Sequence, residues 1–249
     1  MDNNYLYCII GTGEARNFGP IGIGGRGDVV TTINYDNIAA VISGTPITKY
    51  ELNRDNMVAH QKVVEEVMRD YTVLPVRFCT VSESVEDIRR VLRKRYGEFG
   101  NLLKDMDNKV ELGVKALWKD LKGVFLEIGE TEPEIRRLKE KVASVPPDKG
   151  YADRINLGRM VQEALEARKK REAENILGRL SRVSRKTVKN KLHGDSMILN
   201  AAFLVEGGRT KEFDEKMEDL GALHGDRLMF KYVGPVPPFN FVNIVVEWK

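Results

Sequence analysis

The first half of the chain alternates short β-rich apolar runs with segments whose apolar residues recur at helical spacing. Tyr5–Ile10 is one such run, and the polar turn at 34–37 joins two others in the manner of a β-hairpin. Pro75 begins a later run and favours an edge position for it, because proline has no N–H to donate. Ser84 and Asp87 have the spacing of a helix cap. The expected elements are strands at 5–10, 29–33, 38–42 and 74–81 and helices at 57–71 and 85–106.

The second half opens with an alternating strand, and we place a domain boundary just before it. Thr131-Glu132-Pro133-Glu134 predicts a capping box with proline in the first turn of a short helix. A long polar helix is expected from Tyr151 to about Lys189. The remaining expected elements are strands at 110–118, 197–205 and 227–233 and a helix at 210–223.

This order, strand, helical excursion, strand pair, helix, strand, is the ferredoxin-like βαββαβ pattern with an enlarged first crossover. The predicted fold class is therefore α+β with two domains. Residues 1–108 form an N-terminal α+β domain, and residues 109–249 form a modified ferredoxin-like domain. A long helical extension, or arm, occupies about 151–190 of the second domain.

Composition narrows the class of protein. The 249 residues are 42% hydrophobic and 31% charged, which is typical of a globular protein. The 40 basic and 37 acidic residues leave a net charge of +3, too small to require a nucleic-acid partner. No apolar run reaches the length of a membrane-spanning helix, and the N-terminus lacks the basic segment of a secretory signal. We therefore expect a cytoplasmic protein that binds no membrane, with Cys8 and Cys79 as reduced, buried thiols.

Candidate chemistry is sparse. The run from Gly22 to Gly27 spells G-x-G-x-x-G, but β-prone residues follow it where a dinucleotide site needs a helix, so we interpret it as a surface loop. His193 and His224 precede turn-forming Gly-Asp pairs, and His60 on an apolar helix face is expected to be a hydrogen-bonded core residue. No nucleophile elbow, phosphate loop or metal-ligand spacing is present. We predict no catalytic, cofactor-binding or metal-binding residues, no small-molecule substrate and no enzyme activity.

The long helix carries a local basic surplus. Residues 154–191 include twelve basic residues and four acidic ones, with a basic break at Arg168-Lys169-Lys170-Arg171 that interrupts an apolar stripe. No aromatic residues interleave the basic ones, so a stacking platform for nucleic acid is missing. We interpret the helix as an arm for protein contacts, with Arg168 and Arg171 as candidate contact residues. The alternatives are a solvated structural helix and an RNA-binding or adaptor function.

The C-terminal region is rich in proline and aromatic residues. Pro235, Pro237 and Pro238 fix φ and lack N–H groups, so this segment is expected outside a sheet as a stiff, extended ribbon. Phe239 and Phe241, two residues apart in such a ribbon, would point the same way. We expect one of the rings to pack on the C-terminal core, and the pair to support either partner recognition or closure of the two domains against each other. These five residues complete the predicted partner-binding set, and the alternative is a segment that only covers a core edge.

Six strings in this order resemble one protein family across nearly the whole chain. They are Tyr5-Leu6-Tyr7, Ala39–Ser43, Val73–Val81, Val110–Lys115, Leu199–Val205 and Gly234–Val242. The chain is similar to the GvpF/GvpL gas vesicle accessory proteins, which often have Trp at the position of Val236 and Gly at that of Cys79. Because this chain has the larger Cys79 where the family often has glycine, we expect a roomier strand neighbourhood around Cys79 here.

The resemblance implies a non-enzymatic accessory protein of gas vesicle assembly. It implies two α+β domains, the second a modified ferredoxin-like fold with a helical extension. It also implies that the protein binds the hydrophobic shell-forming gas vesicle protein and other accessory proteins, helps to nucleate or build the shell, and stays as a minor component on the gas-facing surface. Cytoplasm and gas vesicle are the expected locations.

Overall fold

The computed structural model describes residues 3–146 and 149–248. The chain folds into two compact units, each of which includes segments that are distant in sequence. The first unit holds the residues up to Leu112, Leu204–Gly208 and the residues from Gly234 on. The second holds Gly113–Phe203 and Arg209–Val233. Independent folding of the predicted domains 1–108 and 109–249 stays a prediction.

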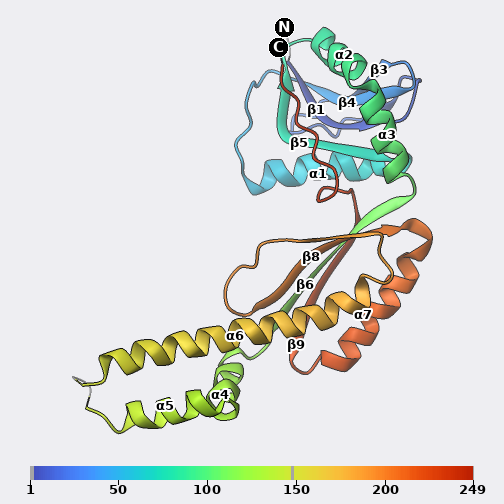
Figure 1. The fold of residues 1–249 in the computed structure, drawn as a ribbon. Coiled ribbons are helices and arrows are strands. Elements are labelled where there is room, and N and C mark those ends of the chain that lie inside the picture. Colours follow the sequence, from blue (N-terminus) through green and yellow to red (C-terminus); the bar gives the residue numbers. More distant parts are fainter. Residues whose placement is uncertain (1–2, 147–148, 249) are drawn as a thin grey trace. The chain divides into compact units, whose positions relative to one another are not determined.

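The first unit is built on a five-stranded sheet of order β2-β3-β4-β1-β5 (Figure 1). The strands are β1 Asn3–Ile10, β2 Asn17–Gly19, β3 Val30–Tyr35, β4 Ile38–Thr45 and β5 Val73–Ser82. β3 and β4 pair antiparallel up to Tyr35 opposite Ile38, which confirms the predicted hairpin. β1 lies between β4 and β5 and pairs antiparallel with both. β5 is the outer strand, as Pro75 predicts.

Both faces of this sheet are covered by helices, and strand alternation divides the side chains between them (Figure 1). Leu6 and Ile9 join a core with the buried residues of α2 Val85–Lys94 and α3 Tyr96–Met106. Tyr5, Tyr7 and Ile10 join a core with those of α1 Arg54–Met68. All six residues from Tyr5 to Ile10 are buried, so β1 forms the centre of the unit.

Helix starts in this unit follow local capping rules. The Asn53 and Ser84 side chains accept hydrogen bonds from the backbone N–H groups of residues 56 and 87, and the second bond confirms the predicted cap. The predicted single helix at 85–106 is two helices that break at Arg95. Arg95 leaves helical geometry at φ −108° and ψ 18°. Its guanidinium binds Glu98 and the carbonyl of Val245, contacts that a local pattern does not reveal.

β5 contains a bulge opposite β1. Leu6 pairs with Thr80, but Cys8 pairs with Pro75, so β5 carries extra residues between these positions. Cys79 lies in this bulge with φ +63°, a conformation that side chains rarely adopt. Glycine suits the position because of this backbone, and the expectation of a roomier neighbourhood around Cys79 stays a prediction. Cys8 is buried, whereas Cys79 is only half-buried, so the expectation of two buried thiols holds for the first alone.

The second sheet has four strands in the order β7-β8-β6-β9. They are β6 Lys109–Trp118, β7 Lys186–Lys189, β8 Met197–Glu206 and β9 Leu228–Val236. The N–H of Trp118 donates to Ser196 O, and that of Gly207 donates to Asn108 O, so β6 and β8 run antiparallel. The helices are α4 Leu121–Thr131, α5 Pro133–Ala143, α6 Tyr151–Leu180 and α7 Thr210–His224, with the short 3₁₀ turn η1 Gly207–Arg209 before α7.

Two predicted features of this half are wrong. The long helix ends at Leu180 rather than near Lys189, because residues 186–189 form β7 at the edge of the sheet. The capping box is absent: Thr131 is the last residue of α4, and its hydroxyl donates to Glu127 O. Pro133 does begin α5, as predicted. Within 3–146 and 149–248, no helix is long and apolar enough to cross a membrane.

Candidate partner-binding surfaces

The proline-rich segment begins inside a strand. β9 runs to Val236 and includes Pro235, so the expectation that this segment stays outside a sheet is wrong for its first part. Proline is tolerated there because β9 is an edge strand of its sheet, where an N–H can be absent without breaking a ladder. Gly234 has φ +129°, and a Cβ on it would lie 2.8 Å from Glu111 O. The close approach of β9 to β6 therefore requires glycine at this position.

After β9 the chain folds into a tight turn rather than an extended ribbon. The N–H of Phe241 donates to Pro238 O at 3.0 Å, and that of Val242 donates to the same oxygen at 2.9 Å. Pro237 and Pro238 are buried, and Pro235 is exposed. The rigid proline backbone therefore serves to close a turn against the first unit.

The two phenylalanine rings contact different cores. Phe239 packs against the cluster of Tyr5 and Tyr7, and Phe241 packs against the cluster of Leu6 and Ile9, which lies on the other face of the sheet. The prediction that the rings point the same way is wrong, because it assumed an extended backbone. The expected packing on the C-terminal core is also wrong, since both clusters are centred on β1.

A buried carboxylate anchors the turn. Glu111 on β6 is 5% exposed, and its two oxygens accept from the backbone N–H of Asn240 at 2.7 Å and from Asn240 Nδ2 at 2.5 Å. Burial raises the pKa of the Glu111 carboxyl, and the two hydrogen bonds from Asn240 oppose that rise. Sequence reasoning missed this pair, whose members are 129 residues apart. Glu111 occupies a polar position in the alternation of β6, so the local pattern gave no signal of its burial.

An apolar cavity of about 300 Å³ lies beside the turn. It opens between the N-terminal part of α1, the β5 bulge and the chain after Phe239. Its lining residues are Met57, His60, Gln61, Pro75, Val76, Arg77, Phe78, Phe239, Val242, Asn243 and Ile244. Met57 at its edge is 50% exposed. The cavity can accept an apolar side chain from outside the unit.

One wall of this cavity belongs to a hydrogen-bonded aromatic cluster. Tyr5 Oη and His60 Nδ1 are 3.0 Å apart, and Tyr7 Oη lies 2.8 Å from Ser43 Oγ. His60 is 4% exposed, and burial lowers the pKa of its imidazole to about 4, so the ring is neutral near pH 7. This confirms the prediction of a hydrogen-bonded core histidine. In the described part of the chain, no three His, Cys, Asp or Glu side chains gather as metal ligands.

The glycine-rich run at 22–27 leads directly into β3 and not into a helix. The Gly22 N–H donates to Asp28 O at 2.9 Å, and Arg26 is ion-paired with Asp28. The Arg26 guanidinium also donates to Tyr50 Oη at 3.0 Å. The run is thus a loop without a following helix, as predicted, but it lies only partly at the surface, because Ile23 is fully buried and its N–H donates to Tyr7 Oη at 2.8 Å.

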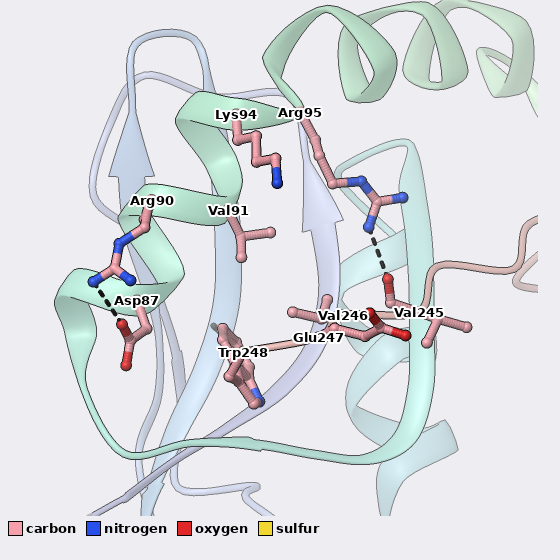
Figure 2. A pocket seen from close by; sticks show the side chains of 9 residues that line it. All are labelled: Asp87, Arg90, Val91, Lys94, Arg95, Val245, Val246, Glu247 and Trp248. Carbon is pink, nitrogen blue, oxygen red and sulfur yellow. Dashed lines mark hydrogen bonds and ion pairs between the residues drawn. The ribbon is translucent and has the colours of Figure 1, made fainter.

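A second cavity, of about 280 Å³, lies between α2 and the residues that follow the turn. Figure 2 shows Arg90, Lys94 and Arg95 on its helical side, with Val246 and Trp248 opposite them. Arg95 Nη1 donates to Val245 O at 2.8 Å. The walls of this cavity are more polar than those of the first one.

The predicted arm is a three-helix assembly within the second unit. α5 lies beside the first half of α6 (Figure 1), where Lys141 and Asp153 form an ion pair of 2.8 Å. Arg168 binds Glu127 of α4 and lies 3.7 Å from Glu172, so it joins α4 to α6. Arg171 is exposed.

The basic surplus of the arm is smaller than the sequence suggested. α6 itself contains seven basic and five acidic residues, because the helix ends at Leu180 and the other basic residues follow it. Lys169 is the most deeply buried of these cations, with 5% of its surface exposed. Its Nζ forms an ion pair of 2.9 Å with Glu166 Oε1. The correction to the helix end therefore removes most of the electrostatic argument for an RNA-binding arm.

Comparison with known proteins connects this architecture to a family. The family model "Gas vesicle synthesis protein GvpL/GvpF" matches residues 3–243. The chain belongs to this family. GvpL/GvpF proteins are accessory proteins in gas vesicle formation.

Individual relatives agree with the GvpL/GvpF assignment. The chain is 27% identical to gas vesicle protein F1 of Halobacterium salinarum, over 98% of this chain and 94% of the relative. It is 29% identical to gas vesicle protein F of a Streptomyces species, over 89% and 91% of the two chains. The crystal structure of GvpF from Anabaena sp. PCC7120 matches with a TM-score of 0.84 and 21% identity, over 99% of this chain and 100% of that one. The fold is thus shared with a solved gas vesicle protein.

In this GvpL/GvpF protein the predicted contact residues fall into two sets. Pro237, Pro238, Phe239 and Phe241 form one turn in the first unit, and Pro235 precedes it on β9. Arg168 and Arg171 lie on α6 of the second unit. A role for either set in partner binding stays a prediction.

Proposed function

We propose that this GvpL/GvpF protein is a non-enzymatic assembly protein that binds the hydrophobic shell-forming gas vesicle protein. In this proposal it helps to nucleate or build the shell and stays as a minor component of the gas-facing surface. It works in the cytoplasm and at the gas vesicle, together with other gas vesicle accessory proteins. It requires no substrate, cofactor or nucleic acid.

The apolar cavity beside Phe239 supports this proposal most directly. A shell protein with an exposed apolar face would aggregate before assembly, so a partner has to cover that face. The cavity of about 300 Å³ offers an apolar site for a protruding side chain, and the exposed Met57 extends its rim with a flexible thioether side chain. Phe239 forms part of the wall and is fixed by the anchored turn. The proposed anchor site is therefore preorganised.

The test compares two substitutions in the same turn. Phe239→Ser removes a ring that lines the cavity, and Phe241→Ser removes a half-buried ring that does not. Both variants lose packing, so their melting temperatures should fall by similar amounts. Only Phe239→Ser should reduce the shell protein that co-purifies from cells, by about tenfold for a loss of 1.4 kcal/mol of binding energy. Equal co-purification with the two variants at matched expression would rule out the cavity as the anchor site.

We also propose the ferredoxin-like fold for residues 109–249. The order β7-β8-β6-β9 places the first and third strands of this half in the middle, and β6 and β8 run antiparallel, as the βαββαβ pattern requires. The long crossover from β6 to β7 carries the arm. Cross-strand nuclear Overhauser effects should show β9 antiparallel to β6 as well. Parallel pairing there would refute this assignment.

A further inference from the structure

β9 is a long strand at one edge of the second sheet. It has nine residues, whereas β7 at the opposite edge has four and β2 at one edge of the first sheet has three. β5, the other edge of the first sheet, is bridged by Ile244. An unpaired edge is a template for another chain, and proteins keep such edges short or covered. Among the strands that the structure describes, β9 is therefore the one that can accept a further strand over most of its length.

Two contacts set the register between β9 and β6. The N–H of Lys119, which follows β6, donates to Arg227 O at 2.9 Å. A Cβ on Gly113 would lie 2.9 Å from Val233 Cγ2, so these two residues are neighbours on one face of the sheet. Six residues separate the two contacts along each chain segment, and they are counted in opposite directions. The strands therefore pair antiparallel without a bulge between these points.

This register places Lys115 opposite Lys231, on the face that Gly113 and Val233 share. Both lysines are exposed. Within the described residues, neither ammonium group forms an ion pair or a hydrogen bond. Like charges directly opposite each other destabilise a sheet. A carboxylate bound beside this lysine pair would therefore stabilise the sheet by neutralising the repulsion.

Exposed apolar side chains flank the lysine pair. Met229 is 41% exposed and Val233 is 61% exposed. Both share a face with Lys231, because each is two residues away from it on the strand. Covering such side chains is favourable, since it removes apolar surface from water. A partner that fits this face therefore carries apolar side chains on both sides of its carboxylate.

The backbone of β9 offers hydrogen bonds on its open side. Residues of an antiparallel strand bond alternately to one side and to the other, and Arg227 bonds towards β6. The N–H and C=O groups of Phe230 and Tyr232 therefore face the open edge. Among the described residues, no backbone hydrogen bond outside helices and sheets involves these two. An extended segment can gain main-chain hydrogen bonds by lying along this edge.

The lysine pair argues against a second copy of this chain at the edge. Two β9 strands that paired antiparallel about Lys231 would place the two Lys231 side chains opposite each other, beside both copies of Lys115. Pro235 shortens the usable edge, because it has no N–H to donate. Charged side chains and prolines are the usual means by which edge strands avoid self-association. An acidic segment is attracted by the same lysines that repel a second copy.

We propose that β9 is a docking site for an extended acidic segment of another protein, which joins the second sheet as a fifth strand. The segment has one carboxylate opposite Lys231 and within reach of Lys115, with an apolar side chain two residues away on either side. Its backbone bonds to Phe230 and Tyr232. The site goes beyond the proposed function, because it belongs to the second unit and requires neither the apolar cavity nor Phe239.

A labelled peptide with this pattern tests the site on the full chain. The probe is Thr-Val-Thr-Glu-Thr-Val-Thr, whose two valines and glutamate share one face of a strand. It should bind saturably in a fluorescence titration. A peptide with lysine in place of the glutamate should bind about tenfold more weakly, because an attraction becomes a repulsion. Absence of saturable binding, or equal binding of the two peptides, would overturn the proposal.

Charge reversal in the protein identifies the lysine. Lys231→Glu should weaken binding of the glutamate peptide about tenfold and strengthen binding of the lysine peptide, because it reverses the sign of the contact. Lys170→Glu is the matched control, since it makes the same change at an exposed position of α6, and it should leave both affinities within about twofold. Circular dichroism checks that both variants are folded. Equal effects of the two substitutions would show attraction by general charge alone and would rule out the site.

Backbone methylation tests whether the peptide binds as a strand. Alternate amides of an added strand point towards β9 and away from it. Methylation of the amides on one side should abolish binding, whereas methylation on the other side should leave the affinity within about threefold. Equal affinities of the two methylated peptides would contradict strand addition. A dimer of the free chain that protects the amides of Phe230 and Tyr232 from hydrogen exchange would identify a second copy as the occupant, and would also overturn the proposal.

Discussion

The central strand β1 buries its tyrosine and isoleucine side chains, whereas the arm exposes side chains of the same two types. From Tyr5 to Ile10 every side chain of β1 is at most 1% exposed, and helices cover both faces of its sheet. In the arm, Tyr151 and Ile155 are 76% and 56% exposed. Each buried apolar side chain contributes about 1.5–3 kcal/mol, whereas an exposed ion pair contributes about 0–1 kcal/mol. The comparison indicates that stability is concentrated in the sheet and that the arm offers surface.

The largest expected difference between the regions comes from removing an aromatic ring in each. Phe99 on α3 is fully buried, so Phe99→Ala should lower the free energy of unfolding by about 3–5 kcal/mol. Tyr151→Ala at the start of α6 should change it by less than about 0.5 kcal/mol, because that ring is exposed. Urea denaturation followed by circular dichroism measures both. Similar losses would show that the arm is part of a shared core.

The second difference is pH-dependent. Burial lowers the pKa of His60 to about 4, whereas an unfolded chain has about 6.5. Between about pH 4 and pH 6.5 the folded state therefore binds fewer protons than the unfolded chain. The contribution of neutral His60 to the free energy of unfolding is complete above about pH 6.5 and is lost as the pH falls towards 4. This loss amounts to about 3 kcal/mol.

His60→Gln should remove this contribution from the pH profile of the unfolding free energy. His193→Gln is the matched control, because His193 is exposed in the loop between β7 and β8. That variant should keep the profile of the parent chain. An unchanged slope in His60→Gln would mean that the imidazole is protonated in the folded state, and the cluster around Tyr5 would need another explanation.

The smallest expected effects separate two ion pairs within the arm. Arg159 and Glu163 form an exposed pair of 2.5 Å, so Arg159→Ala should cost about 0.3–0.5 kcal/mol, and less in high salt. Arg168→Ala should cost more, about 1 kcal/mol, because the largely buried Arg168 side chain pairs with Glu127 of α4, whereas Glu172 keeps its ion pair with Arg227. Thermal unfolding of the two variants distinguishes these costs. Equal shifts would indicate that Arg168 does not join α4 to α6.

Local patterns predicted most elements of the fold. The apolar run of β1, the β3–β4 hairpin and the cap at Ser84 are encoded within a few residues, and each forms where predicted. Errors occurred where a distant contact decides the outcome. The helix expected to reach Lys189 stops at Leu180 because residues 186–189 pair with β8. α4 was missed, because its neighbours α5 and α6 support it in the folded chain.

The sequence by itself determined the periodicity, the family strings and the scarcity of candidate chemistry, because each depends only on residue type and spacing. It also identified the proline and phenylalanine residues of the turn. Tertiary structure alone decided what those residues do: Glu111 binds Asn240 and holds the turn, and Phe239 and Phe241 enter different cores. Such contacts join residues more than a hundred positions apart, and the free energy of burial that selects them exists only once the sheet has formed.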